Sequence, residues 1–157
     1  MTDEAKARES AIRILARRDH SKAEMKRKLI RNGFSPEVAE ATISSLQEKG
    51  YLDDRRYAER WAAAALEGGR CYGPRLRAEL RQRGIDQATA SEVISELTSG
   101  SDETETLRML LRRRFPEFDP FTADDREKRR IFGFLQRRGF STGAIMTVFK
   151  TVSTEFE

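Results

Sequence analysis

One pattern occurs three times along this chain and limits what the chain can fold into. In each copy a short basic amphipathic run ends at a glycine, an apolar residue follows, and a capping residue then starts a second amphipathic run. The copies read MKRKLIRNGFSPEVAEATISSL, LRAELRQRGIDQATASEVISEL and IFGFLQRRGFSTGAIMTVFKTV. Their glycines, Gly33, Gly84 and Gly139, lie 51 and 55 residues apart. An internal repeat of this period is typical of a stacked array of small units.

The residues around the three glycines are apolar at matching positions, which supports the alignment of the copies. These positions lie eight and four residues before each glycine and one and ten residues after it: Met25, Leu76 and Ile131; Leu29, Leu80 and Leu135; Phe34, Ile85 and Phe140; Ile43, Ile94 and Phe149. Apolar residues at this spacing lie on one face of a helix. No alternation of apolar and polar residues typical of strands competes with that pattern.

The pattern predicts an all-α fold of nine short helices, arranged as three tandem three-helix units that resemble helix-turn-helix motifs. We place the units at residues 1–52, 53–98 and 103–157. The small polar stretch TSGSDETE, residues 98–105, is the best linker candidate. A unit of this size is too small to bury a core unaided. Neighbouring units are therefore expected to pack together into an elongated, curved molecule.

Capping residues predict where several helices begin. Ser21 with Glu24 is expected to form a capping box, in which each side chain satisfies a free backbone N–H of the other residue. Asp53 is expected to cap the first helix of the second unit. Thr122 with Asp125 is expected to cap the middle helix of the third unit, and the last helix is expected to run to about Val152.

The chain offers few residues for catalysis or metal binding, since it contains one cysteine and one histidine. A single cysteine forms no intrachain disulfide, and the two residues cannot supply a metal site of the Cys and His type. Arg70 beside Cys71 could lower the thiol pKa, but a serine-like loop residue is the favoured interpretation. We interpret His20 as a solvated loop residue in a polar turn. We expect no catalytic site, no metal and no cofactor.

The sequence predicts a cytoplasmic protein without membrane segments. No apolar run approaches the roughly 18 residues needed to span a bilayer. The first ten residues, MTDEAKARES, are charged, and no apolar stretch of the kind that forms a secretion signal follows them.

Arginine clusters in the second and third units are the main candidates for binding, on a chain with a net charge of +4. The candidates are Arg70, Arg75, Arg77, Arg81, Arg83, Arg112, Arg113, Arg126, Arg129, Arg130, Arg137 and Arg138. A solvated helix face explains those near helix C-termini, where the helix dipole favours cations. It explains Arg75 and Arg77 less well, because they lie in a first turn. Arginine binds carboxylate or phosphate, so the partner is a nucleic-acid backbone or an acidic protein.

Several aromatic residues lie near these charges. Tyr72, in the loop GGRCYGP, is a candidate for stacking on a base or on a partner side chain. Tyr57 and Trp61 are four residues apart on one helix and are expected in the core, as are Phe132 and Phe134. Three phenylalanines in the connection FPEFDPF either clamp onto the third unit or form an exposed contact patch: Phe115, Phe118 and Phe121.

Four segments together resemble the RecX family of regulators of the RecA recombinase. They read ILARRDHSKAEMKRKL, GFSPEVAEATISSLQEKGYLDDRRYAERW, GPRLRAELRQRGI and FLQRRGFSTGAI. The resemblance runs from about Ala11 to Lys150. The elements Ala-Arg-Arg before a capped helix, Gly-Tyr-Leu-Asp-Asp opening the second unit and Gly-Pro before its basic helix are specific in combination.

The resemblance implies a non-enzymatic protein of three helical repeats, which we expect to be a monomer. It implies binding to RecA and the RecA–DNA filament, with inhibition of ATPase, strand exchange and filament growth, and so modulation of recombination and DNA repair. The arginine faces would then touch RecA and the DNA backbone. The alternative is a sequence-tolerant DNA-binding protein that acts without RecA, since turns within helix-turn-helix motifs often contain glycine. An enzyme acting on nucleic acid would need a carboxylate or metal cluster, which we do not find.

Overall fold

A computed structural model describes residues 1–151 of the chain, with the side chains as far as residue 150. Over this range the chain forms nine α-helices and no strand, which confirms the predicted all-α fold of three-helix repeats. The first three helices are α1 (Asp3–Leu15), α2 (Lys22–Arg31) and α3 (Pro36–Glu48). The next three are α4 (Asp54–Glu67), α5 (Gly73–Gln82) and α6 (Gln87–Thr98). The last three are α7 (Glu103–Arg114), α8 (Asp125–Arg138) and α9 (Thr142–Thr151).

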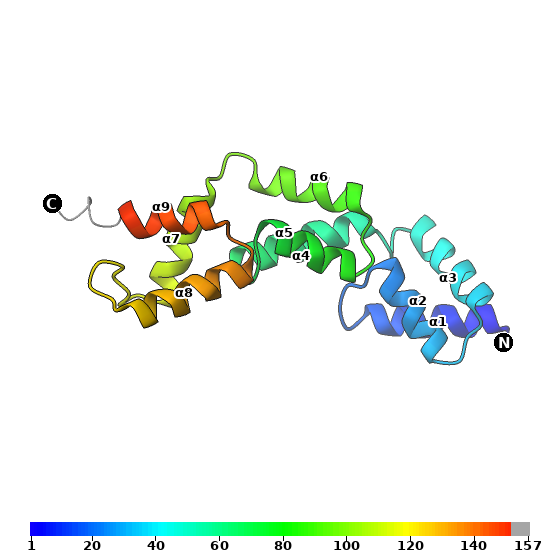
Figure 1. Cartoon of the computed structure of the whole chain (residues 1–157). Helices are drawn as coiled ribbons and strands as arrows, with labels where there is room; N and C mark the ends of the chain where they lie inside the picture. Colours follow the sequence, from blue (N-terminus) through cyan, green and yellow to red (C-terminus); the bar gives the residue numbers. More distant parts are fainter. Residues whose placement is uncertain (152–157) are drawn as a thin grey trace.

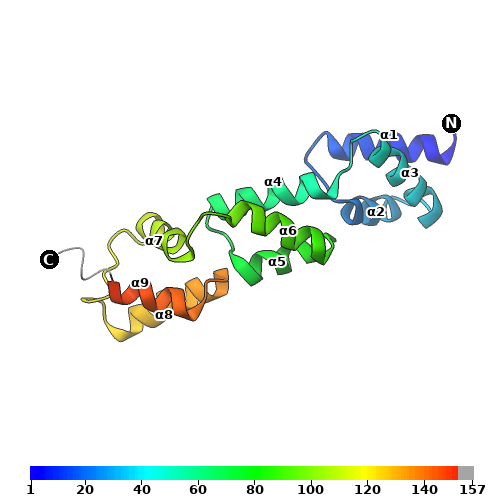
Figure 2. The same cartoon turned by 90° about the horizontal axis from the view of Figure 1, so that it is seen from above.

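The molecule is elongated, and its three-helix units follow one another from end to end (Figure 1). The extensive helix contacts are made within units, such as those of α1 with α3, α4 with α6 and α7 with α9. Figure 2 shows the middle helices α2, α5 and α8 along one side of the molecule and α1, α4 and α7 along the other. Corresponding helices of successive units therefore lie on the same side of the molecule.

Each unit has its own apolar core, built from the positions that repeat in the sequence. At most 1% of the surface of these core residues is exposed: Met25, Leu29, Leu76, Leu80, Ile131 and Leu135. Tyr57 is buried in the second core as predicted, while Phe132 and Phe134 are half-buried against the third. No helix crosses the predicted unit limits, which themselves remain a prediction. The end of the third predicted unit, residues 152–157 with Val152, lies outside the described part of the chain.

Most predicted caps are present, and one is wrong. Asp53 accepts a hydrogen bond from the backbone N–H of Arg56 at 3.1 Å, as expected for an N-cap. The predicted cap at Thr122 is wrong, because Asp124 caps α8 and accepts from the N–H of Glu127 at 2.8 Å. The N–H of Thr122 instead donates to the carbonyl of Asp119, which keeps this residue in a turn ahead of the helix.

The predicted capping box at α2 is formed only by half. The Ser21 hydroxyl accepts from the N–H of Glu24 at 3.1 Å, as predicted. The Glu24 carboxylate binds the guanidinium of Arg18 at 3.0 Å. Burial alone would raise the pKa of Glu24, but hydrogen bonds from Tyr57 and Arg18 outweigh it and lower that pKa. This carboxylate therefore serves the contact between α2 and the second unit.

Each of the two predicted alternatives for the aromatic connection between α7 and α8 holds for part of it. Phe115 packs edge-on against Phe134, with ring centroids 5.1 Å apart, and Phe118 packs against Phe149 at 5.3 Å. These two residues clamp the connection onto the third core. Phe121 is 48% exposed and belongs to the surface.

Candidate interaction surfaces

The first and second units meet where α2 begins, and we call this contact the first joint. The Ser21 hydroxyl donates a hydrogen bond to the backbone carbonyl of Arg83, at the end of α5. The backbone N–H of Lys22 donates to the carboxylate of Asp54 at 2.8 Å. The N-terminus of α2 is therefore held by two elements of the second unit.

The second and third units meet where α5 begins, and we call this contact the second joint. The backbone N–H of Tyr72 donates to the carbonyl of Arg138 at 2.7 Å. The Tyr72 ring stacks on Phe140, with centroids 4.9 Å apart and planes at 6°. The Arg138 guanidinium donates to the carbonyls of Gly69 and Arg70 at 3.3 and 3.2 Å. Arg138 and one face of Tyr72, both predicted contact candidates, thus have contacts inside the chain.

The two joints repeat one arrangement. At the first joint, Ser21 is the N-cap of α2 and donates to the carbonyl of Arg83, the residue before Gly84. At the second joint, Tyr72 is the N-cap of α5 and donates to the carbonyl of Arg138, the residue before Gly139. A Cβ atom at Gly84 would overlap the Cβ of Ala23, and one at Gly139 would overlap the carbonyl oxygen of Tyr72. Both glycines also have positive φ, at 85° and 104°. Gly33 has a φ of 98° as well, but a Cβ there would meet nothing within 4 Å.

The prediction of a solvated His20 is wrong, since this side chain is only 3% exposed. Its Nδ1 lies 2.9 Å from the carbonyl oxygen of Arg18, which holds the ring against the end of α1. Burial, above all, lowers the pKa of His20. The known inward packing before an N-cap concerns apolar residues, so a histidine at this position gave no clear sequence signal of burial. His20 directly precedes the N-cap Ser21.

The prediction of Cys71 as a loop residue without a core role is also wrong. Its side chain is 4% exposed and belongs to the core of the second unit. Burial and the nearby Glu79 carboxylate raise the pKa of the Cys71 thiol despite the arginines around it. Cys71 is therefore a core residue and not an activated thiol.

Trp61 lies at the edge of the second core, beneath two of the candidate arginines. The Arg83 guanidinium lies 4.1 Å from the centre of the Trp61 ring, and that of Arg70 lies 5.6 Å from it. Arg83 also forms an ion pair with Glu79 at 2.9 Å. Trp61 is therefore only partly a core residue, and Arg83 is committed to contacts within its own unit.

The outer face of α5 presents three of the predicted arginines to solvent. Arg75, Arg77 and Arg81 are all exposed. Arg75 pairs with Glu79 at 2.8 Å. Arg77 and Arg81, one helical turn apart, line a shallow hollow between α5 and α6 and have no ion pair with any described residue. Two guanidinium groups on this helix are therefore free to bind an acidic partner.

The third unit presents more exposed arginines, and Arg113, like Arg138, is committed to the second joint. Arg113 donates to the backbone carbonyl of Glu67 at 3.0 Å, which ties α7 to the end of α4. The exposed candidates without an ion pair in residues 1–150 are Arg112 on α7 and Arg126, Arg129, Arg130 and Arg137 on α8. Figure 2 shows that α5 and α8, the helices that carry most of these arginines, follow one another along the same side of the molecule.

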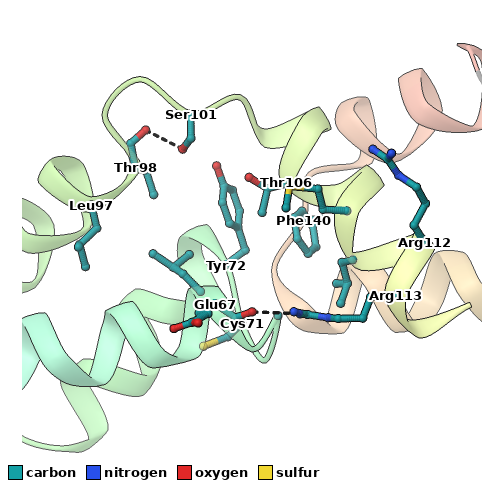
Figure 3. Close-up of a pocket in the computed structure, with 14 residues that line it drawn as sticks. Glu67, Cys71, Tyr72, Leu97, Thr98, Ser101, Thr106, Arg112, Arg113 and Phe140 are labelled. Atoms are coloured by element: carbon teal, nitrogen blue, oxygen red, sulfur yellow. Dashed lines mark hydrogen bonds between the residues drawn. The ribbon is translucent and has the colours of Figure 1, made fainter.

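A groove of about 720 Å³ lies between the second and third units. Figure 3 shows Tyr72 and Phe140 side by side in this groove, between the end of α6 and α7. Leu97 and Met109 also line it and are 38% and 62% exposed, which is unusual for large apolar side chains. Arg112 belongs to the same lining. The groove thus combines apolar surface with a cation, a composition suited to a protein partner.

The candidate interaction surfaces belong to an all-helical fold. No group of three His, Cys, Asp or Glu side chains suited to a metal ion occurs among the described residues. No helix in the same part of the chain is long and apolar enough to cross a membrane. The fold presents exposed arginines on α5, α7 and α8. These features define an elongated helical repeat protein with exposed basic side chains.

Comparison with known proteins identifies the family. Family models of the first, second and third three-helix domains of RecX match residues 7–46, 53–94 and 101–149. The regulatory protein RecX of Trichlorobacter lovleyi is 42% identical over 141 residues, covering 90% of this chain and 92% of that protein. That of Syntrophotalea carbinolica is 39% identical over 140 residues, covering 89% and 92%. The chain belongs to the RecX family of regulatory proteins.

Solved structures agree with this fold. The crystal structure of RecX from Lactobacillus salivarius superposes with a TM-score of 0.73 at 20% identity, covering 97% of each chain. A second crystal structure, of a regulatory protein RecX, gives a TM-score of 0.74 and covers 92% of this chain and 72% of that one. These likenesses extend the match to the order and placement of all three units.

Proposed function

We propose that this protein is a cytoplasmic, monomeric regulator that binds the RecA filament on DNA and inhibits its ATPase, strand exchange and growth. It acts by binding and performs no reaction of its own. Its membership of the RecX family supports a partner related to RecA. The regulation of recombination and DNA repair then follows from control over the filament.

The observation that carries this proposal is the exposure of arginines on α5 and α8, two helices on the same side of the molecule (Figure 2). Arg77 and Arg81 have no ion pair within the described chain, and helix α8, which carries further exposed arginines, follows α5 on the same side of the molecule. A filament presents the same surface again and again along its axis, and an elongated protein can contact several copies at once. The groove beside Arg112 adds apolar contact area to such an interface.

The proposal is tested by titrating the full-length protein into RecA bound to single-stranded DNA and measuring ATP hydrolysis. The wild-type protein is expected to inhibit at or below one molecule per RecA. Replacing Arg75, Arg77 and Arg81 together by Ala is expected to weaken inhibition at least about tenfold, because each lost charged contact removes about 1 kcal/mol or more.

A matched triple variant controls for the loss of charge. Arg8, Arg27 and Arg31 are exposed on α1 and α2, so their replacement by Ala removes the same charge away from α5. This control is expected to inhibit nearly as well as the wild type. No inhibition by the wild-type protein would refute the proposal. Unchanged inhibition by the α5 variant would move the contact surface to the third unit.

The alternative function, DNA binding without RecA, makes a different prediction in the same experiment. It predicts tight binding to DNA alone, with an affinity that falls steeply as salt increases. DNA binding without any effect on RecA ATPase activity would favour this alternative.

A further inference from the structure

A second hollow lies within the first unit, away from the arginines of α5 and α8. It has a volume of about 470 Å³ and is formed between the end of α1 and the outer side of α2. Its cationic lining consists of Arg13, Arg17, Arg18 and Lys28. Ser10 and Asn32 add a hydroxyl and an amide, and no carboxylate belongs to the lining.

The charges around this hollow are not balanced within the described chain. Arg13 has a partner in Glu9, with 3.4 Å between charged atoms, and Arg18 has one in Glu24 at 3.0 Å. Arg17 and Lys28 have no ion pair with a described residue. The C-terminal ends of α1 and α2 each offer only about −0.5 of an elementary charge. An excess of about one positive charge therefore remains, which equals the charge that one phosphodiester would neutralise.

A buried histidine marks the same place. His20 lines the hollow, and its Nε2 is buried with no hydrogen-bond partner in the described structure. The charged groups around it are Arg18 and Lys28, which lower its pKa, and Glu24, which raises it. A negative ligand beside these cations would offset their effect and favour the imidazolium form of His20.

We propose that this hollow binds a phosphate group, with Arg17 and Lys28 as its charged donors and Ser10 and Asn32 as its neutral ones. A guanidinium presents two parallel N–H groups to phosphate oxygens, and an ammonium supplies a point charge beside them. Phosphate of this kind occurs in the backbone of a nucleic acid and as the free ion. The site does not depend on RecA, so it can be tested with the protein alone.

The first experiment measures binding of a fluorescent single-stranded oligothymidylate to the full-length protein by anisotropy, over a range of salt concentrations. The double variant Arg17→Gln, Lys28→Gln is expected to bind at least about tenfold more weakly. Its plot of log affinity against log salt should also be less steep by about 0.7, because the variant loses one phosphate contact and each such contact on single strands contributes about 0.7. The control is Arg8→Gln, Lys49→Gln, which removes the same charges from exposed positions outside the hollow.

The second experiment uses His20 as a reporter, since it is the only histidine in the chain. Its imidazole NMR signals are titrated with pH alone, with inorganic phosphate and with the oligothymidylate. Bound phosphate is expected to raise the pKa of His20 in the wild type but not in the Arg17→Gln, Lys28→Gln variant. If inorganic phosphate raises the pKa of His20 and the oligothymidylate does not, the site binds the free ion. If both ligands raise this pKa, the site binds the nucleic-acid backbone.

Two results would overturn the proposal. In the first, the Arg17→Gln, Lys28→Gln variant (the hollow variant) and its control bind the oligonucleotide equally weakly, and neither ligand changes the pKa of His20 in the wild type. The other is a rise in the His20 pKa that persists in the hollow variant. Circular dichroism of each variant shows whether the helices are intact, so a loss of binding through unfolding is recognised.

Discussion

Replacing Gly139 by Ala is the sharpest test of the second joint. This glycine has a φ of 104°, and a Cβ there would overlap the carbonyl oxygen of Tyr72 and lie 2.8 Å from the Cβ of Arg75. Both neighbours belong to the second unit, and one of them is backbone. The substitution must therefore either push the second and third units apart or distort the start of α5.

The expected cost is a sum of three contributions. A non-glycine residue in the left-handed conformation costs about 1–2 kcal/mol. Loss of the hydrogen bond from the Tyr72 N–H to the Arg138 carbonyl costs about 0.5–1.5 kcal/mol. Loss of the stack between Tyr72 and Phe140 costs about 0.5–1.5 kcal/mol. The free energy of unfolding should therefore fall by about 2–5 kcal/mol.

Gly33→Ala is the matched control. Gly33 has nearly the same φ, 98°, but a Cβ there meets nothing within 4 Å. The free energy of unfolding of Gly33→Ala should fall only by the cost of the left-handed conformation, about 1–2 kcal/mol. Urea denaturation followed by circular dichroism measures both values, and small-angle X-ray scattering measures the shape of each variant. Equal losses for the two variants, with unchanged scattering, would refute the role given to the joint.

Two further predictions concern buried groups. Burial raises the pKa of the Cys71 thiol, so a chromogenic disulfide reagent should react with it slowly in the folded protein and rapidly in urea. Rapid reaction without denaturant would show instead that the thiol is accessible. Hydrogen bonds lower the pKa of Glu24 below its ordinary value of 4.5. The ionised carboxylate therefore stabilises the fold above about pH 4.5, and this stabilisation is lost as the pH falls below about 4.5 and through the lowered pKa. Glu24→Gln should therefore destabilise the protein at neutral pH and have a smaller effect near pH 4, as urea denaturation can measure; an equal effect at both pH values would contradict this.

The sequence alone predicted the helices and the cores well, because both follow from local periodicity. Leu29, Leu80 and Leu135 repeat at one helical position, and all three are fully buried. The joints were not predictable in the same way. The hydrogen bond between Tyr72 and Arg138 joins two backbone groups. Because nearly every residue carries such groups, no pattern of side chains in the sequence predicts this bond.

The candidate site was predicted in part. Arginine clusters are visible in any sequence, and Arg77 and Arg81 are indeed exposed and without ion pairs in the described chain. The sequence could not separate them from Arg83, Arg113 and Arg138, which contact an aromatic ring or backbone carbonyls. That distinction depends on neighbours that are far away along the chain. The burial of His20 and Cys71 was missed because both follow polar or glycine-rich segments that resemble solvated loops.

The use of backbone groups in the joints has a consequence for how such a chain can change. A bond from the Tyr72 N–H to the Arg138 carbonyl does not depend on either side chain. The joints also need a few particular side chains, such as the Ser21 hydroxyl and the Asp54 carboxylate, and small residues where the units meet, such as Gly84 facing Ala23. Exposed residues that take no part in the joints, such as Arg77 and Arg81, can therefore be replaced without altering the spacing between units. Such a scaffold can acquire a new binding preference by surface substitution while keeping its length.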